Sequence, residues 1–240
     1  MVERRRAKPS RSEVKRPRRD GRATPAAHLG DDIVRELHAT ARPGKGEILI
    51  KVFSEAAGAF MEGDYESAVR LGEQSKHMAL RAASVREFLG LAYYRMGSWK
   101  EAARELSAFK RITGSVDQNP VIADCYRAQG KPERALELCD EVKPGAAPRA
   151  VVYEAAIVAA GALVEMNRID DAIERIERLD LRPDVAEEHH LRAWYVLADL
   201  LEKKGRFTQA REYFAAVEAA DPDLTDAQER GARLSGAKGT

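Results

Sequence analysis

The sequence has few of the residues and segments that would mark a secreted or membrane protein. Its two cysteines, Cys125 and Cys139, are too few for a disulfide framework or a four-thiolate metal site. The uncharged run at residues 155–164 is far shorter than the roughly 20 apolar residues that a membrane helix needs, and no apolar stretch follows the basic N-terminal residues as in a secretory signal. We therefore expect a cytoplasmic protein with no membrane insertion, in which both cysteines are buried, reduced thiols.

The sequence also lacks the usual motifs of catalysis. It contains no Gly-rich loop ending in Gly-Lys-Ser/Thr, no Gly-x-Ser-x-Gly and no His-Glu-x-x-His. The only adjacent histidines are His189 and His190, and neighbouring residues on a helix point about 100° apart, which does not suit a shared metal. We interpret them as solvated residues at the start of a helix. The expectation is a protein with no enzymatic activity, no metal, no cofactor and no small-molecule substrate.

Positive charge is concentrated at the N-terminus. Residues 1–22 contain ten Lys and Arg against three Asp and Glu, together with Pro9 and Pro17 and almost no large apolar residues. Such a segment cannot bury enough surface to offset the entropy of ordering it, so we expect a disordered basic arm over residues 1–30 and a short disordered tail over 236–240. The candidate contacts of this arm with nucleic acid or an acidic surface are Arg4, Arg5, Arg6, Arg16, Arg18 and Arg19. The alternative is a solubilising tail with no fixed partner.

From about residue 31 the apolar residues follow a helical period, without the alternation of a strand. A small turn residue recurs, followed two positions later by a mostly apolar residue and three positions after that by alanine. The five copies begin at Gly63, Gly97, Gly130, Asn167 and Gly205, which lie 34, 33, 37 and 38 residues apart. A recurring unit of this length predicts stacked helical pairs that share one continuous core.

This pattern resembles the tetratricopeptide repeat over residues 49–222. The best copies contain Leu89-Gly90-x2-Tyr93 and Trp194-x2-Leu197. The resemblance implies an all-α, right-handed superhelical solenoid of about five repeats over residues 31–235. We expect an N-terminal helix at 31–42 and a capping helix at 225–234. Residues 85–138 also resemble a group of uncharacterised actinobacterial proteins with this repeat.

In this family the first helix of each pair lines a concave groove, so the resemblance implies a partner-binding surface. The candidate groove residues are Phe53, Phe60, Met61, Glu87, Leu91, Tyr94, Arg95, Asp124, Arg127, Glu165, Tyr195, Asp199 and Glu202. The N-terminal end of this set is apolar, and either the helix at 31–42 covers it or it is exposed for a partner helix. In the last three copies, six acids outnumber three cations, which makes that half of the groove acidic.

These observations predict a protein-interaction module or scaffold that binds a peptide or helix of a partner protein. The basic arm would tune binding electrostatically, for example by docking transiently in the acidic half of the groove. An alternative is an RNA- or ribosome-associated factor whose arginine-rich arm contacts nucleic acid. The sequence does not identify the partner.

Overall fold

The computed structural model describes residues 26–182, 185–223 and 225–236. Within these ranges the chain forms helices and no strand, apart from an isolated bridge between Pro144 and Ala147. The helices are α1 (Asp31–Thr40), α2 (Gly46–Met61), α3 (Tyr65–Met78), α4 (Ala83–Arg95), α5 (Trp99–Thr113), α6 (Asn119–Ala128), α7 (Pro132–Asp140), α8 (Arg149–Glu165), α9 (Ile169–Glu177), α10 (Glu188–Lys203), α11 (Phe207–Ala220) and α12 (Ala227–Gly236). The predicted all-α fold is confirmed.

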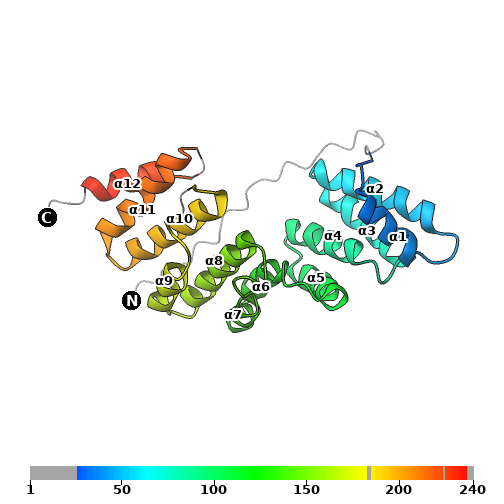
Figure 1. Ribbon diagram of the computed structural model, residues 1–240, viewed down its shortest axis with the longest axis horizontal. Helices are drawn as coiled ribbons and strands as arrows, with labels where there is room; N and C mark the ends of the chain where they lie inside the picture. The colour runs from blue at the N-terminus through cyan, green and yellow to red at the C-terminus, as the bar shows by residue number, and fades with distance from the viewer. Residues whose placement is uncertain (1–25, 183–184, 224, 237–240) are drawn as a thin grey trace, which may run out of the picture.

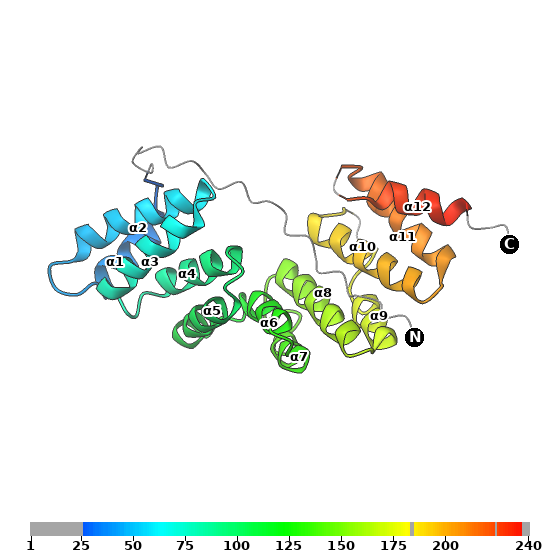
Figure 2. The same cartoon turned by 180° about the vertical axis from the view of Figure 1, so that it is seen from behind.

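The helices are arranged as an arc of stacked pairs (Figure 1). The pairs α2–α3, α4–α5, α6–α7, α8–α9 and α10–α11 follow one another along the chain, with α1 before them and α12 after them. Seen from either side, α4, α6 and α8 follow the inner edge of the arc, and α5, α7 and α9 lie outside them (Figure 2). None of the helices in the described ranges is long and apolar enough to cross a lipid bilayer.

The turn within each pair has a left-handed residue. The glycines of four turns have φ between 71° and 79°, and Asn167 has φ 60°, the only positive value at a non-glycine position in the described residues. Glycine reaches this region without strain and asparagine is the residue that most often replaces it, because a helix commonly ends on a left-handed residue. The same five residues marked the repeat in the sequence, so the predicted turns are confirmed.

Small residues set the close approach of the two helices in a pair. A Cβ atom on Gly90 of α4 would lie 2.5 Å from Leu106 Cδ2 on α5. The alanine that follows each turn is completely buried in every pair: Ala68, Ala102, Ala135, Ala172 and Ala210. Because larger side chains at these positions would force the helices apart, the repeated small residues account for the close packing within the pairs.

The two outer helices close the ends of the core. Leu37 of α1 is completely buried among side chains that include Leu49 and Phe53 of α2. Before α1, the backbone N–H of Ala27 donates to the Ser54 carbonyl over 2.9 Å, so the chain already lies along α2 within the range assigned to the arm. At the other end, Leu234 of α12 is buried in the cluster that surrounds the α10–α11 pair.

The interpretation of His189 and His190 as solvated residues is wrong. His190 is completely buried, and the His189 ring lies 4.1 Å from it and 4.5 Å from the Tyr153 ring of α8, centroid to centroid. The Nδ1 atom of His190 accepts a hydrogen bond from the backbone N–H of Glu187 over 3.0 Å. This capping bond directs the His190 side chain toward the start of its own helix, where the ring packs against Tyr153. Because Tyr153 belongs to a different helix, no local sequence pattern predicted this contact.

Both cysteines are buried and unpaired, as expected from their positions on the two helices of one repeat. Burial raises the pKa of the Cys125 thiol to about 12, and burial likewise raises the pKa of the Cys139 thiol to about 12. The thiolate is the reactive form of cysteine, so both side chains behave as small apolar groups.

Candidate partner-binding groove

The groove begins at α2, where α1 covers only part of the apolar surface. Phe53 is 3% exposed beneath α1, which removes it from the accessible surface. Phe60 is half-buried and Met61 is 79% exposed. The coverage by α1 that we considered from the sequence therefore applies to Phe53 and leaves Met61 open.

A row of aromatic rings connects the covered and open parts of this surface. The Phe88 ring of α4 lies 5.2 Å from Phe53 and 5.8 Å from Phe60, and the Phe60 ring lies 5.3 Å from Tyr65, centroid to centroid. The Phe53–Phe88 and Phe60–Tyr65 pairs are edge-to-face, a geometry that adds stability beyond the area that the rings bury. Phe88 is not among the groove positions that we assigned by aligning the repeats. Its place one residue before Leu89 in an apolar helix was the signal that could have identified it.

The second repeat contributes four of the candidate residues from α4. Leu91 and Tyr94 are half-buried, whereas Arg95 is exposed. Glu87 accepts a hydrogen bond from the side-chain amide of Gln118 over 2.8 Å, which ties α4 to the start of α6. Phe60, Met61 and Leu91 thus place accessible apolar side chains on the first helices of two consecutive repeats.

A chain of polar contacts crosses the middle of the groove through three successive repeats. The Tyr94 hydroxyl of α4 donates to Asp124 of α6 over 2.7 Å, and Arg127 of α6 donates to both Asp124 and Glu165 of α8, over 2.9 Å and 2.8 Å. The guanidinium lies over Gly161, where an added Cβ would be 2.5 Å from its central carbon. Burial and the bond to Asp124 raise the pKa of Tyr94, so it acts as a neutral donor. The network fixes the register between these repeats.

The C-terminal end of the groove is occupied by the chain itself. Arg230 of α12 donates to Asp199 over 2.8 Å and to Glu202, and its guanidinium also contacts the Tyr195 hydroxyl over 3.1 Å. Arg233 donates to Glu202 over 2.7 Å. Alignment of the repeats correctly placed Tyr195, Asp199 and Glu202 together. It did not reveal Arg230 and Arg233, although their spacing of three residues on the capping helix was a signal that they share one face.

The acidity of the groove is therefore smaller than the first helices alone indicate. Five of the six acids counted there form ion pairs within the chain. One of these five is Glu154, which pairs with Arg192 over 3.0 Å. Asp117 is exposed, and its carboxylate forms no ion pair with any residue that the structure describes. An external or internal basic segment would have to compete with these existing pairs.

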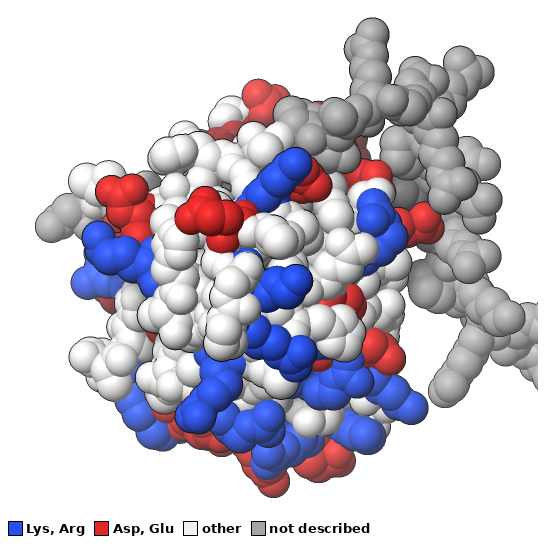
Figure 3. All heavy atoms as spheres, turned by 90° about the vertical axis from the view of Figure 1, so that its right-hand side faces the viewer, with Lys and Arg blue, Asp and Glu red and all other residues white. Residues whose placement is uncertain are grey.

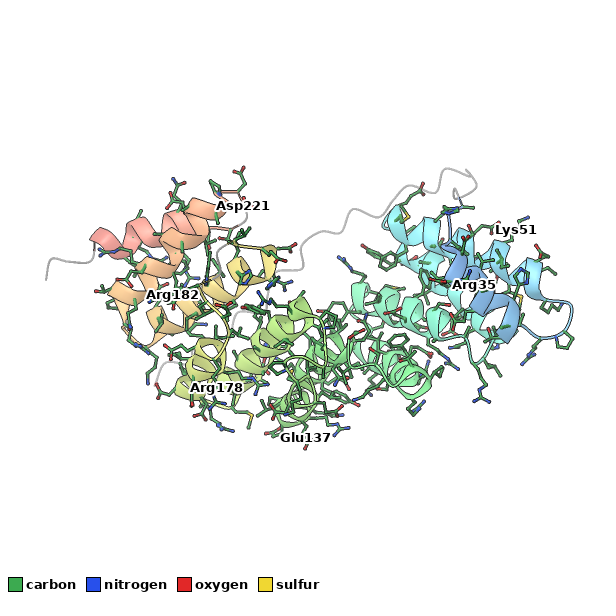
Figure 4. All side chains as sticks on the ribbon, viewed as in Figure 1. Arg35, Lys51, Glu137, Arg178, Arg182 and Asp221 are labelled. Carbon is green, nitrogen blue, oxygen red and sulfur yellow. The ribbon has the colours of Figure 1, made fainter. Side chains whose placement is uncertain are left out.

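The side chains on the outside of the arc point away from this groove. Glu137 of α7 and Arg178 after α9, both labelled in Figure 4, project from the outer side. The candidate arginines of the basic arm, Arg4 to Arg19, lie outside the described residues. The candidate groove residues thus come from α2, α4, α6, α8 and α10, with α1 packed against the first of these helices and α12 against the last repeat.

Comparison with known proteins agrees with this architecture. Residues 157–225 match the family profile described as tetratricopeptide repeat. The fold is similar to that of a thermophilic TPR protein from Thermus thermophilus, with 16% identity, a TM-score of 0.59 and coverage of 78% of this chain and 98% of that chain. No curated protein matches the sequence.

Two further solved structures share the fold. The apo form of the quorum sensor NprR from B. thuringiensis is 12% identical, with a TM-score of 0.65 over 85% of this chain and 62% of that chain. YrrB, described as a TPR protein with an unusual peptide-binding site, is 16% identical, with a TM-score of 0.51 over 75% of this chain and 90% of that chain. The tetratricopeptide resemblance and the helical solenoid are therefore confirmed, whereas the resemblance to actinobacterial proteins stays a prediction.

Proposed function

We propose that this tetratricopeptide-repeat chain is a protein-binding scaffold that takes a peptide or helix of a partner in the N-terminal half of its concave groove, without turnover. The observation that carries the proposal is the accessible apolar surface on α2 and α4. Met61 is 79% exposed and follows the half-buried Phe60, whose ring lies 5.8 Å from that of Phe88, three residues before the half-buried Leu91 on α4. Large exposed apolar side chains that adjoin one another are typical of interaction sites.

The contacts within the groove favour this half over the other. Asp199 and Glu202 at the C-terminal end already bind Arg230, so a partner there would have to displace a charged group that is only 15% exposed. Phe60, Met61 and Leu91 have no such cover in the described residues. An amphipathic helix could place its apolar face on them, with anchors at i, i+3 and i+7. The peptide-binding site of YrrB, which has the same fold, is in accord with such a role.

The test is site-specific crosslinking in the native cell. A photoreactive phenylalanine analogue at position 61 or 91 should capture one shared partner protein. The matched control is the same photoreactive group at position 112. Ile112 is also an exposed apolar residue, at 44%, but it lies near the end of the outer helix α5. Capture at position 112 equal to that at 61 and 91, or no protein at either groove position, would contradict the proposal.

The basic arm is proposed to tune this binding electrostatically. Its support is the excess of cations in residues 1–22 and the attachment of the described chain at Ala27 to Ser54 on α2, close to the groove. Removing residues 1–22 should change the affinity for the captured partner at low ionic strength and have little effect at 0.5 M salt, where charges are screened within about 4 Å. Equal affinities with and without the arm at both ionic strengths would exclude it from the mechanism.

A further inference from the structure

A second surface lies apart from the groove, at the edge of the first repeat where the α1–α2 and α3–α4 connections meet. A depression of about 500 Å³ is lined there by Ala39, Thr40, Arg42, Leu80 and Arg81. The backbone N–H of Arg42 donates to the Met78 carbonyl at the end of α3 over 2.9 Å. This bond holds Arg42 against the loop that carries Leu80 and Arg81, so two arginines from distant parts of the sequence line one depression.

Both arginines are exposed and unused by the fold. Their side chains form no ion pair or hydrogen bond with any residue in the described ranges, in contrast to most arginines of the repeats. Leu80 between them is 49% exposed. A free guanidinium can bind a carboxylate with two parallel hydrogen bonds, and the depression therefore offers two such donors beside an apolar floor.

The other charged side chains next to the depression are held by contacts within the fold. Arg86 donates two hydrogen bonds to the Leu80 carbonyl, over 3.0 Å and 3.3 Å, and its guanidinium lies behind the loop. The adjacent carboxylates are already engaged, because Glu36 accepts from the backbone of Ser84 over 3.2 Å and the buried Glu105 binds Lys76 and Arg86. Figure 3, which views this end of the molecule, shows many Lys and Arg side chains over the lower half of the face, with Asp and Glu side chains among them.

We propose that this depression binds an acidic peptide segment of a partner protein, with a carboxylate on Arg42 and Arg81 and an apolar side chain on Leu80. The charge of the site is complementary to carboxylates. The lining favours a peptide over nucleic acid, since it contains an exposed leucine and no aromatic side chain on which a base could stack. The site is separate from the concave groove and does not depend on the function proposed for it.

The test is a direct binding measurement with the full chain. The probe is a fluorescein-labelled peptide, Gly-Glu-Glu-Leu-Asp-Glu-Gly, whose polarisation is titrated with wild type and with the double variant Arg42→Glu, Arg81→Glu at 0.15 M salt. The charge-reversed variant should bind at least about tenfold more weakly, because both guanidinium donors become repulsive carboxylates. Replacing the leucine of the probe by serine should weaken binding to wild type severalfold, because the contact with Leu80 is lost.

Three controls make the outcome specific. The double variant Lys131→Glu, Arg134→Glu carries the same charge change on exposed residues at the start of α7 and should bind within about twofold of wild type. The groove variant Met61→Glu should also bind the probe as wild type does. Circular dichroism of every variant should match wild type, because all substituted side chains are exposed.

Several results would overturn the proposal. The first is that wild type shows no saturable binding of the peptide. The second is that the two charge-reversed variants lose peptide binding equally, and the third is that the groove variant Met61→Glu loses it. A single-stranded RNA oligonucleotide of equal charge that binds more tightly than the peptide, and is released by Arg42→Glu, Arg81→Glu, would assign the site to nucleic acid instead. Crosslinking at positions 61 and 91 in the cell is read out independently of the peptide titration, so either proposal can fail while the other stands.

Discussion

Arg230 of α12 donates a hydrogen bond to Asp199 of α10 across 31 residues of sequence, with its guanidinium 4.6 Å from the centre of the Phe214 ring. One side chain thus joins the closing helix to both helices of the fifth repeat through a charged contact and a cation–π contact. It also fills the groove position that a basic partner residue would take. The contact that attaches the closing helix therefore also occupies two of the candidate groove acids, Asp199 and Glu202.

Replacing Arg230 with methionine should therefore destabilise the C-terminal repeat. The variant leaves Asp199 paired with Lys203 alone and Glu202 paired with Arg233 alone, and removing one member of a largely buried network costs up to about 3 kcal/mol. The urea midpoint should fall, with hydrogen exchange accelerating first in α11 and α12. Arg178→Met is the matched control, since its pair with Glu174 is 67% and 60% exposed and such pairs contribute about 0–1 kcal/mol. Equal midpoints for the two variants would contradict this role of Arg230.

Acid should weaken the junction between the first two repeats. Burial raises the pKa of Glu105, but hydrogen bonds from Arg86 and Lys76 outweigh it and hold this pKa below its usual value. The unfolded glutamate has a pKa of about 4.3, so the stabilising contribution is complete above that pH and is lost as the pH falls through the lower folded value. Thermal unfolding between pH 6 and pH 3 should show a steeper decline for wild type than for Glu105→Gln. A decline of equal slope would argue against this assignment.

The Gly90 contact predicts a steric cost without any change of charge. In Gly90→Ala the new methyl group would meet Leu106 of α5 at 2.5 Å, and overpacking of a core typically costs about 1–3 kcal/mol. Chemical denaturation should show this loss. Gly30→Ala, where nothing lies within 4 Å of the added carbon and φ is −63°, should be neutral. A neutral Gly90→Ala would show that α4 and α5 can separate freely.

The buried histidine pair predicts a dependence on mildly acidic pH. Burial, and then the neighbouring His189, lower the pKa of His190 below its ordinary value of about 6.5. Below pH 6.5 the unfolded chain therefore binds a proton that the folded chain resists, and stability falls as the pH decreases. His190→Gln keeps a capping acceptor for Glu187 and should flatten the melting temperature between pH 7 and pH 5. The exposed His77→Gln should retain the wild-type slope, and identical slopes in all three proteins would exclude His190 as the cause.

Much of the fold could be predicted because the determining contacts are local or periodic. Asn167 stands where four other copies have glycine, and its φ of 60° shows that the position requires a left-handed backbone. The predicted closing helices also form, at Asp31–Thr40 and Ala227–Gly236. In each case a few neighbouring residues specify the backbone, and the repeat supplies several independent copies of the signal.

The candidate groove was predictable as a set of positions but not as a surface. Repeat register placed Tyr94, Asp124 and Arg127 on adjacent helices, and the structure brings them into one hydrogen-bonded network. Register did not indicate that Phe53 is covered by α1 or that Asp199 binds Arg230. Exposure and ion pairing depend on which side chain arrives from a helix outside the repeat.

The sequence by itself determined the helical pairs, their turns and their small contact residues, since each follows from the backbone preference of a residue or from a period of about 34 positions. Only the tertiary structure decided which of those residues are accessible. His190 is buried beside Tyr153, and Arg42 and Arg81 from two different loops line one depression. Contacts between segments far apart in the chain have no local period, so packing alone settles where charge and apolar surface remain free.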